Sequence, residues 1–318
     1  MGPQTMMMEL EQVLRAGQPP PRDQFALDYD DFVRWFWKHK GLLKERERVD
    51  AFWEATHENL KLAYEALDER ETRLEEAYRV MRDDLQVAQQ IQSAQLPSLP
   101  ALMDGELELA VHHSQLSAVG GDYYDFFETV DGRYAVGVFD ISGHGVAAAL
   151  AMAFLRSELI HAAAGATSPR RVADEVNARI LDFMRKVKRY ATINYVLFEP
   201  LSIRYVCGGG NGLLVRDGQM ITFAKGDPFL GLRNRPYRES VLPFDDGDIL
   251  ALYTDGIIEA QNSDEADYTI RRLNTLIHRH ATDPVDSILE TCIEDFEGFC
   301  REPHDDVTLM IMRKKSNE

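Results

Sequence analysis

Short acidic side chains stand beside glycine at four places in the second half of the chain. These segments are Gly-Gly-Asp-Tyr-Tyr-Asp (120–125), Asp-Ile-Ser-Gly-His-Gly (140–145), Thr-Asp-Gly (254–256) and His-Asp-Asp (304–306). Aspartate carboxylates are hard oxygen ligands of the kind that Mg²⁺ and Mn²⁺ bind in octahedral arrangement. Two of the segments directly follow strongly apolar runs, so we expect their aspartates at the ends of buried strands. The pattern predicts a divalent-cation site.

Each segment alone has a simpler explanation. Asp-Gly is a common turn signal. Three consecutive glycines at 208–210 suggest a phosphate cradle, but no Gly-Lys-Ser/Thr follows, so a P-loop is excluded. Gly-Gly-Asp-Tyr at 120–123 suggests a nucleotide cyclase with a Gly-Gly-Asp/Glu-Phe motif, which would leave the other three segments unexplained. Their joint presence favours the metal site.

Taken in order, the motifs resemble the SpoIIE/RsbU-like branch of the PPM-type, metal-dependent serine/threonine protein phosphatases. The resemblance covers residues 86–313. It begins with Gln-Val-Ala-Gln-Gln-Ile-Gln (86–92) and Leu-Pro (96–97), which look like the linker helix that precedes this domain in the family. It continues through Gly-Gly-Asp-Tyr-Tyr-Asp-Phe (120–126), Asp-Ile-Ser-Gly-His-Gly (140–145), Tyr-Thr-Asp-Gly-Ile-Ile-Glu-Ala (253–260) and Asp-Asp-Val-Thr-Leu (305–309). Four motifs in this order and spacing are specific.

The resemblance implies a role for each aspartate. Asp140 would bridge two Mn²⁺ or Mg²⁺ ions, with the backbone carbonyl of Ile141 as a further ligand. Asp255 and Asp305 would hold the other ion, and Asp122 would orient metal-bound water. The implied catalytic residues are therefore Asp122, Asp140, Asp255 and Asp305, and the implied metal ligands are these four with Ile141. The ions would activate water for in-line attack on a phosphoserine or phosphothreonine.

Three further positions need interpretation. Asp306 stands where relatives outside this branch often carry Asn, so it ranks below Asp305. His144 is either a general acid or a turn histidine that borders the site, and we favour the turn histidine. Relatives carry Ala-Gly-His-Asn-Pro where this chain has Gly-Gly-Gly-Asn-Gly (208–212). Glycine at Gly210 puts the role of the missing histidine in doubt, but it removes no metal ligand.

The elements that must position these residues follow from hydrophobic patterning. Strands are predicted near 107–111, 134–140, 192–198, 203–207, 212–216, 221–224, 248–253 and 306–312. Helices are predicted at 145–164, 169–186, 268–280 and 284–299. Because this order is no regular β-α-β alternation, it indicates an α+β fold. We expect a four-layer α-β-β-α phosphatase sandwich over residues 101–318.

Before the prolines at 97 and 100 the chain is charged, glycine-poor and helical in character. Apolar residues spaced alternately by four and three, from Leu60 to Gln92, form the stripe of a coiled coil. Glu71 and Gln92 are polar interruptions of that stripe. We expect a parallel dimerising helix, with a long helix packed on its own domain as the alternative. Residues 1–85 are predicted to be a helical dimerisation and regulatory region, and residues 86–100 a linker helix and proline-containing junction.

Composition excludes several classes of function. The formal net charge of −18 disfavours nucleic-acid binding. Three scattered cysteines give no disulfide framework or thiolate zinc site. No run approaches the roughly 18 apolar residues of a membrane helix, and the first residues predict no signal peptide. We therefore expect a cytoplasmic protein without a membrane partner.

Together these features predict a phosphoric monoester hydrolase acting on protein phosphoserine or phosphothreonine. The resemblance implies a STAS-type anti-sigma-factor antagonist as its substrate, in a bacterial signalling pathway. An upstream activator would act at the N-terminal helices of a homodimer. The alternative is a catalytically weak, phosphatase-like scaffold that works by binding. A scaffold would be expected to lose a metal aspartate, whereas this chain keeps Asp122, Asp140, Asp255 and Asp305.

Overall fold

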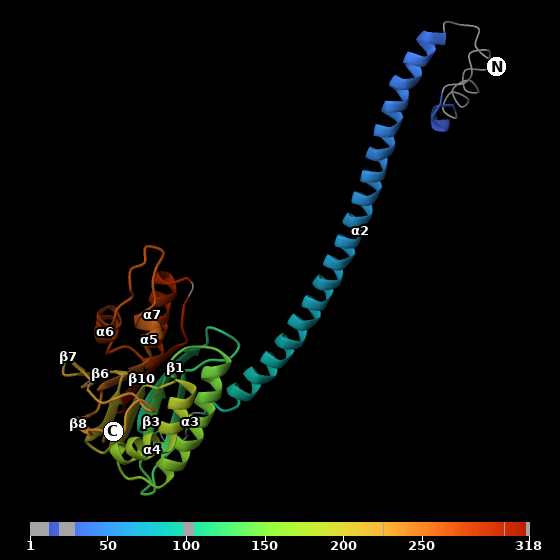
Figure 1. Ribbon diagram of the computed structural model, residues 1–318. Helices are drawn as coiled ribbons and strands as arrows, with labels where there is room; N and C mark the ends of the chain where they lie inside the picture. The colour runs from blue at the N-terminus through green and yellow to red at the C-terminus, as the bar shows by residue number, and fades with distance from the viewer. Residues whose placement is uncertain (1–12, 19–28, 98–104, 225, 302, 316–318) are drawn as a thin grey trace. The chain divides into compact units, whose positions relative to one another are not determined.

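A computed structural model describes residues 13–18, 29–97, 105–224, 226–301 and 303–315. The chain divides into two compact units, Met1–Met81 and Arg82–Glu318, and we describe each by itself. The predicted domain limits at residues 85 and 100 remain our proposal. Figure 1 shows the helices and strands with the labels used below.

The first unit consists mainly of the helix α2, Tyr29–Ser93, whose last residues belong to the second unit. Its rich content of Glu, Lys, Arg, Leu and Ala favours helix at every turn. Six apolar residues of the predicted stripe are at least half exposed: Leu60, Tyr64, Leu67, Leu74, Tyr78 and Met81. Leu85 and Ala88, nearer the end of the helix, are less exposed. This stripe of the helix is therefore available to a partner.

The second unit contains two five-stranded antiparallel sheets. One sheet has the order β1-β10-β9-β6-β7, from Leu107–Ser114, Val307–Lys314, Ile249–Tyr253, Asn211–Arg216 and Gln219–Thr222. The other has the order β2-β3-β4-β5-β8, from Tyr123–Glu128, Tyr134–Phe139, Ile193–Glu199, Ser202–Gly208 and Ser240–Pro243. The sheets pack face to face over apolar side chains that include Val138, Leu252 and Met310.

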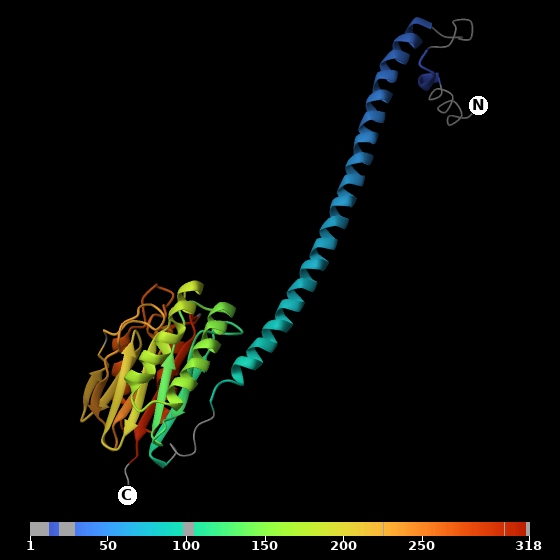
Figure 2. The ribbon, with the colours of Figure 1, turned by 60° about the horizontal axis from the view of Figure 1, so that its bottom comes forward.

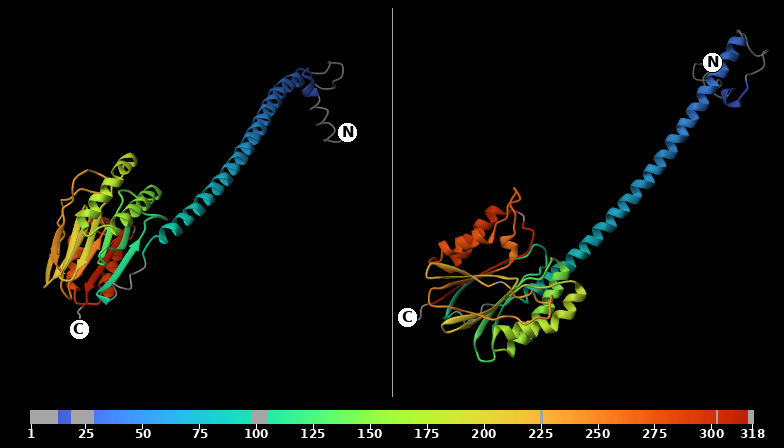
Figure 3. Two further views of the ribbon diagram at one scale, coloured as in Figure 1. Left: turned by 90° about the horizontal axis from the view of Figure 1, so that it is seen from below. Right: turned by 60° about the vertical axis from the view of Figure 1, so that its left-hand side comes forward.

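Helices cover the outer faces of both sheets. Helices α3 (Val146–Ala164) and α4 (Pro169–Val187) pack on the sheet that contains β3. The short α5 (Asp255–Ile258), α6 (Ile270–Arg279) and α7 (Val285–Phe299) lie on the sheet that contains β9. Figure 3 shows the strands between the two helical layers, and Figure 2 shows α3 and α4 side by side. The predicted four-layer α-β-β-α sandwich is confirmed.

Helix α3 has the length and apolar composition of a membrane span, the one such helix in the described part of the chain. Its buried side chains, among them Met152, Leu155 and Leu159, pack on the sheet. A core position on a sheet therefore explains the apolar character of α3.

Helix α4 begins at the N-cap Ser168, whose hydroxyl accepts a hydrogen bond from the N–H of Arg171 at 3.3 Å.

Three elements were missing from the predicted pattern: β2, β8 and α5. One predicted seam residue was also misplaced. Gln92 does not lie on an open coiled-coil stripe, because its side chain is 5% exposed and is bonded within the second unit. At the position of Gln92, burial of an amide with hydrogen-bond partners replaces the apolar seam that the heptad pattern suggests.

Candidate active site

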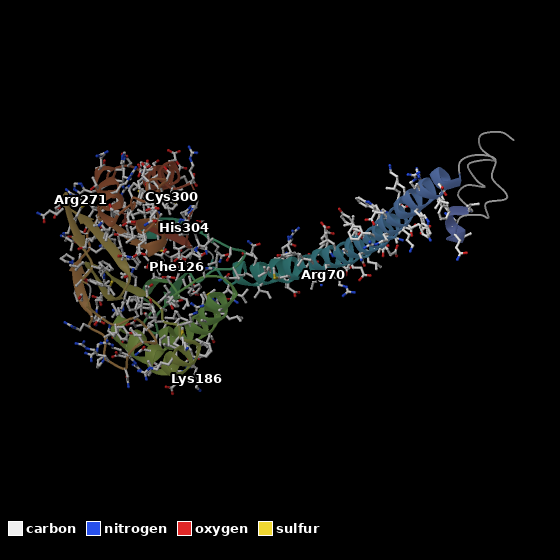
Figure 4. The ribbon with its side chains drawn as sticks, turned by 45° about the horizontal axis from the view of Figure 1, so that its top comes forward. Arg70, Phe126, Lys186, Arg271, Cys300 and His304 are labelled. Atoms are coloured by element: carbon white, nitrogen blue, oxygen red, sulfur yellow. The ribbon has the colours of Figure 1, made fainter. Side chains whose placement is uncertain are left out.

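The four acidic segments meet at one end of the sandwich. Asp122 precedes β2, and Asp140 follows β3, its neighbour in the same sheet. Asp255 begins α5 directly after β9, and Asp305 precedes β10 in the other sheet. Tyr123 pairs with Phe139 and Tyr253 pairs with Leu309, so each pair of strands brings its aspartates to a common edge. Figure 4 shows His304, the neighbour of Asp305, on the α7 side of the sandwich near Cys300.

Asp306 fixes the main chain around this edge. Its Oδ2 accepts a hydrogen bond from the N–H of Gly121 at 2.6 Å, and its Oδ1 accepts one from the N–H of Leu116 at 2.8 Å. The side chain is 2% exposed. A Cβ atom at Gly120 would clash with the same carboxylate, and one at Gly256 would clash with the carbonyl of Asp306. Asp306 therefore joins a loop of one sheet to the strand β10 of the other.

Asp122 is buried behind this loop. Its Oδ2 accepts hydrogen bonds from the hydroxyls of Thr254, at 2.8 Å, and Thr308, at 2.6 Å. Burial and the nearby charge of Asp140 raise the pKa of Asp122 well above its ordinary value, and the two hydroxyls oppose that shift. The same hydroxyls therefore fix the position of the carboxylate and favour its ionised form.

The threonine hydroxyls belong to a longer chain of hydrogen bonds. Nδ1 of His113 lies 2.9 Å from the Thr308 hydroxyl. That hydroxyl has one hydrogen, which it donates to Asp122, so Nδ1 of His113 must be the donor toward Thr308. Burial is the main cause that lowers the pKa of His113. A neutral His113 protonated on Nδ1 supplies the donor for the Thr308 hydroxyl, and its buried Nε2 has no hydrogen-bond partner among the described residues.

Asp140 carries the strongest sign of crowded carboxylates. Burial, followed by the charges of Asp255 and Asp305, raises the pKa of Asp140 to about 8. Burial also raises the pKa of Asp305, against a hydrogen bond from the N–H of Asp306. Like charges brought close together in a partly buried place favour protonation. They also favour the binding of a cation that would compensate them.

The backbone of Ile141 lies close to that of Gly121, in the loop before β2. Its side chain is fully buried, and its N–H donates to the carbonyl of Gly121 at 3.3 Å. A Cβ atom at Gly121 would come within 2.8 Å of the Ile141 carbonyl oxygen. Glycine at 121 therefore allows a close approach that a larger residue would prevent.

The donor set fits a hard divalent cation. The ion pairs of the described residues include no Lys or Arg partner for Asp122, Asp140, Asp255, Asp305 or Asp306. Within the same described ranges, no three acidic, His or Cys side chains are tightly enough grouped to form a finished metal cage. The carboxylates therefore lie at one edge of the sandwich and repel one another there. Binding of an ion would require their side chains to move closer together.

Two sequence predictions at the rim can now be located. His144 is exposed, and its charge is one of the lesser influences on the pKa of Asp305, after burial. It borders the predicted site from the turn between Gly143 and Gly145. Gly210, in the place of the family's histidine, packs against the side-chain amide of Asn194. The space that a side chain would take at Gly210 is occupied by Asn194.

The residues that sequence reasoning missed are those that connect the motifs. Thr254 directly precedes Asp255, and Thr308 follows Asp306 by two positions. This closeness in sequence to the acidic motifs was the only signal that could have identified them. Gln92 also reaches the site loop. Its Nε2 donates to the carbonyl of Gly120 at 2.8 Å, and its Oε1 accepts from the N–H of Gly120 at 3.1 Å.

Two antiparallel sheets between helical layers, with aspartates of both sheets at one edge, are the PP2C fold, which the solved structures named below share. The family model described as Stage II sporulation protein E (SpoIIE) matches residues 130–315. The chain belongs to this SpoIIE family, as the resemblance of its motifs predicted.

Known proteins agree with this assignment. Phosphoserine phosphatase RsbP of Bacillus subtilis (strain 168) is 23% identical over 184 residues, which are 55% of this chain and 45% of RsbP. The chain spans less than half the length of the curated relatives it matches. Among solved structures, the SiaA-PP2C domain of Pseudomonas aeruginosa has a TM-score of 0.67 at 23% identity, covering 74% of this chain and 98% of that domain. The phosphatase PstP, solved with two manganese ions, has a TM-score of 0.51 at 17% identity, covering 66% and 99%.

Proposed function

We propose that this chain is a metal-dependent phosphatase that hydrolyses phosphoserine or phosphothreonine on a partner protein. One observation carries the proposal: at one edge, burial and then the charges of Asp255 and Asp305 from the other sheet raise the pKa of Asp140, and the ion pairs of the described residues include no Lys or Arg partner for these carboxylates. Membership of the SpoIIE family supports it. A purely structural cluster would be expected to contain cations that neutralise it.

In this proposal Asp140, Asp255, Asp305 and the carbonyl of Ile141 hold the ions, two of Mn²⁺ or Mg²⁺. Bound ions would supply the activation of a water nucleophile and the neutralisation of phosphoryl charge. Asp122 orients that water. Because Thr254 and Thr308 both donate to Oδ2 of Asp122, its Oδ1 would be the oxygen that accepts a hydrogen bond from water. The PstP structure with manganese supports the choice of ion.

The partner is a phosphorylated protein in a bacterial partner-switching pathway, and we propose a STAS-type anti-sigma-factor antagonist in the cytoplasm. The similarity to RsbP, which is named a phosphoserine phosphatase, supports this class of substrate.

The test of activity is Mn²⁺-dependent release of phosphate from a phosphoserine protein by the full chain and by Asp140→Asn. We expect the variant to lose about a hundredfold or more in kcat, because a carboxylate that would hold the ions loses its charge. Circular dichroism of both proteins controls for folding. Equal rates, or a wild-type protein that binds the phosphoprotein without turnover, would favour the scaffold alternative.

We further propose that α2 forms a parallel homodimer through its exposed stripe and receives an upstream activator there. Leu67→Asp with Leu74→Asp should convert the dimer to a monomer in sedimentation equilibrium, because both side chains are more than half exposed and lie on the heptad stripe. Ala66→Asp with Thr72→Asp adds the same charge away from the stripe and should leave the dimer intact. A monomeric wild-type chain would contradict this proposal.

A further inference from the structure

Arg189 lies against the turn that carries Asp140. Helix α4 ends at Val187, and Lys188 adopts a left-handed conformation with φ 55°, which reverses the chain. The N–H of Arg189 then donates to the carbonyl of Met184 at 2.9 Å. The end of α4 thereby leads the chain directly into the site.

The residues around Arg189 are paired with the Asp140 turn. The N–H of Ser142 donates to the carbonyl of Tyr190 at 2.9 Å, and the N–H of Tyr190 donates to the Ser142 hydroxyl at 3.1 Å. The N–H of Thr192 donates to the carbonyl of Asp140 at 2.8 Å, and the Thr192 hydroxyl accepts from the N–H of Asp140 at 2.9 Å. These bonds on both sides fix the main chain from which the Arg189 side chain extends.

The guanidinium of Arg189 lies over Gly143. Its Nη1 donates to the carbonyl of Ser142 at 2.7 Å. Gly143 has φ 82°, and a Cβ atom there would clash with Nη1. Glycine at this position therefore permits the left-handed turn and also leaves the space in which the guanidinium lies. The positively charged guanidinium of Arg189 therefore lies on the turn that follows Asp140 and is partly exposed to solvent.

The charge of Arg189 is not compensated by a carboxylate in the described part of the chain, since its side chain enters none of the ion pairs found there. A guanidinium has five N–H donors, and the bond to Ser142 uses one. Arginine presents its donors as a planar fork that matches phosphate oxygens in pairs. In a chain of net charge −18, an arginine bonded to the turn two residues after Asp140 is suited to an anion that approaches this turn.

We propose that Arg189 binds the phosphoryl group of the phosphoserine or phosphothreonine substrate beside the Asp140 turn. This inference rests on the proposed phosphatase function and adds a substrate-binding residue to it. Arg189 would offer two N–H donors to phosphoryl oxygens, and Asp140, Asp255 and Asp305 are the residues that would hold the ions. It would also reject substrates that lack the dianionic phosphate.

The test uses the full chain with Mn²⁺, a phosphoserine peptide as substrate, and inorganic phosphate as a competitive inhibitor. For Arg189→Ala we expect KM and the inhibition constant of phosphate to rise about tenfold or more, the size of a lost charge-assisted hydrogen bond. The affinity for Mn²⁺ and the Tm should stay at the wild-type values. Lys186→Ala removes the same charge from the exposed surface of α4, where Figure 4 shows Lys186, and should change KM less than twofold.

A purely structural role gives a different result. If Arg189 only holds the Ser142 carbonyl, Arg189→Ala will lose Mn²⁺ affinity in proportion to its rise in KM, and the proposal is then overturned. If Arg189→Ala does not fold, Arg189→Lys decides. Lysine keeps the charge and one bond to Ser142, but it lacks the planar fork, so KM must still rise at unchanged Mn²⁺ affinity.

Failure of this inference can be separated from failure of the proposed function. Asp140→Asn is measured in the same series. If Asp140→Asn turns over the peptide like wild type, the phosphatase assignment itself is wrong. If Asp140→Asn is inactive while Arg189→Ala keeps both KM and the phosphate inhibition constant within twofold of wild type, only the role of Arg189 is wrong.

Discussion

The side-chain amide of Gln92 is hydrogen-bonded to both the carbonyl and the N–H of Gly120, at 2.8 and 3.1 Å. Its Oε1 also accepts a hydrogen bond from Gln115 at 3.0 Å. Gly120 is followed by Gly121, which Asp306 holds, and by Asp122. The last turn of α2 is thus bonded to the loop that positions Asp122, within the same unit.

Gln92→Ala should therefore loosen the loop before it affects the rest of the unit. Two buried main-chain groups of Gly120 would lose their partner, at a cost of about 1–3 kcal/mol each. We expect faster amide hydrogen exchange at residues 120–122 and weaker Mn²⁺ binding. Gln90→Ala, at an exposed position two residues earlier, is the control. Unchanged exchange in Gln92→Ala would show that the loop is held by Asp306 alone.

Asp305 and Asp306 should respond differently to the same substitution. Asp306→Asn keeps one side-chain oxygen but replaces the other with an NH2 donor, so only one of the N–H groups of Leu116 and Gly121 can stay bonded to it. We therefore expect about 1–3 kcal/mol lower stability without metal. Asp305→Asn should instead weaken Mn²⁺ binding and leave the metal-free protein as stable as wild type, because it relieves repulsion with Asp140. Denaturant unfolding in EDTA and Mn²⁺ titration separate the two. A stable Asp306→Asn protein with poor metal binding would reverse the roles.

The metal-free protein should become less stable as the pH rises from about 5 to 8. The pKa of Asp140 is about 8 in the folded chain, above its value of about 3.9 when unfolded. In this interval the folded state holds more protons, so the free energy of unfolding falls with pH. Binding of Mn²⁺ should release protons and tighten as the pH rises.

Unfolding in EDTA across that interval measures the pH slope of stability, and calorimetry in buffers of different ionisation enthalpy measures the protons released. Asp140→Asn is the control, and its slope should be smaller than that of wild type. A wild-type slope of opposite sign would contradict the crowding of carboxylates at this edge.

Thr308→Val should raise the pKa of Asp122 further. Valine has nearly the shape of threonine, but it removes a donor to Asp122 and an acceptor for His113. We expect about 1–3 kcal/mol lower stability and an activity profile moved to higher pH. Thr308→Ser keeps the hydroxyl and should retain the wild-type profile. If valine and serine behave alike, packing and not the hydrogen bond explains Thr308.

Long apolar runs made much of the fold predictable from the sequence. The helix predicted at residues 145–164 is observed as Val146–Ala164, and the strand predicted at 248–253 is observed as Ile249–Tyr253. Strand β2 was missed because Asp125 interrupts its apolar pattern. That side chain is 6% exposed and accepts hydrogen bonds from the Tyr123 hydroxyl and the N–H of Phe126. A buried charge with partners inside the fold looks like a turn residue in sequence.

The aspartates of the candidate site were predictable because each stands at the end of an element. The connections among them were not. Gln92, Gly120 and Asp306 are far apart in the chain, and only the folded sheets bring them together. The heptad pattern assigned Gln92 to the stripe of α2, since spacing along one helix contains no information about a second partner.

Gly210 and Asn194 have a consequence for how this sequence can change over generations. A Cβ atom at Gly210 would lie 2.6 Å from the amide of Asn194, which is 1% exposed and donates to the carbonyl of Asn211 at 2.7 Å. Restoring the histidine of relatives at position 210 would therefore first require a smaller residue at position 194. Positions 194 and 210 should therefore covary among descendants. Histidine at 210 introduced first would clash with Asn194, and a smaller residue at 194 introduced first would leave a cavity. Asn194 therefore makes a return from glycine to histidine at position 210 unfavourable as a single substitution.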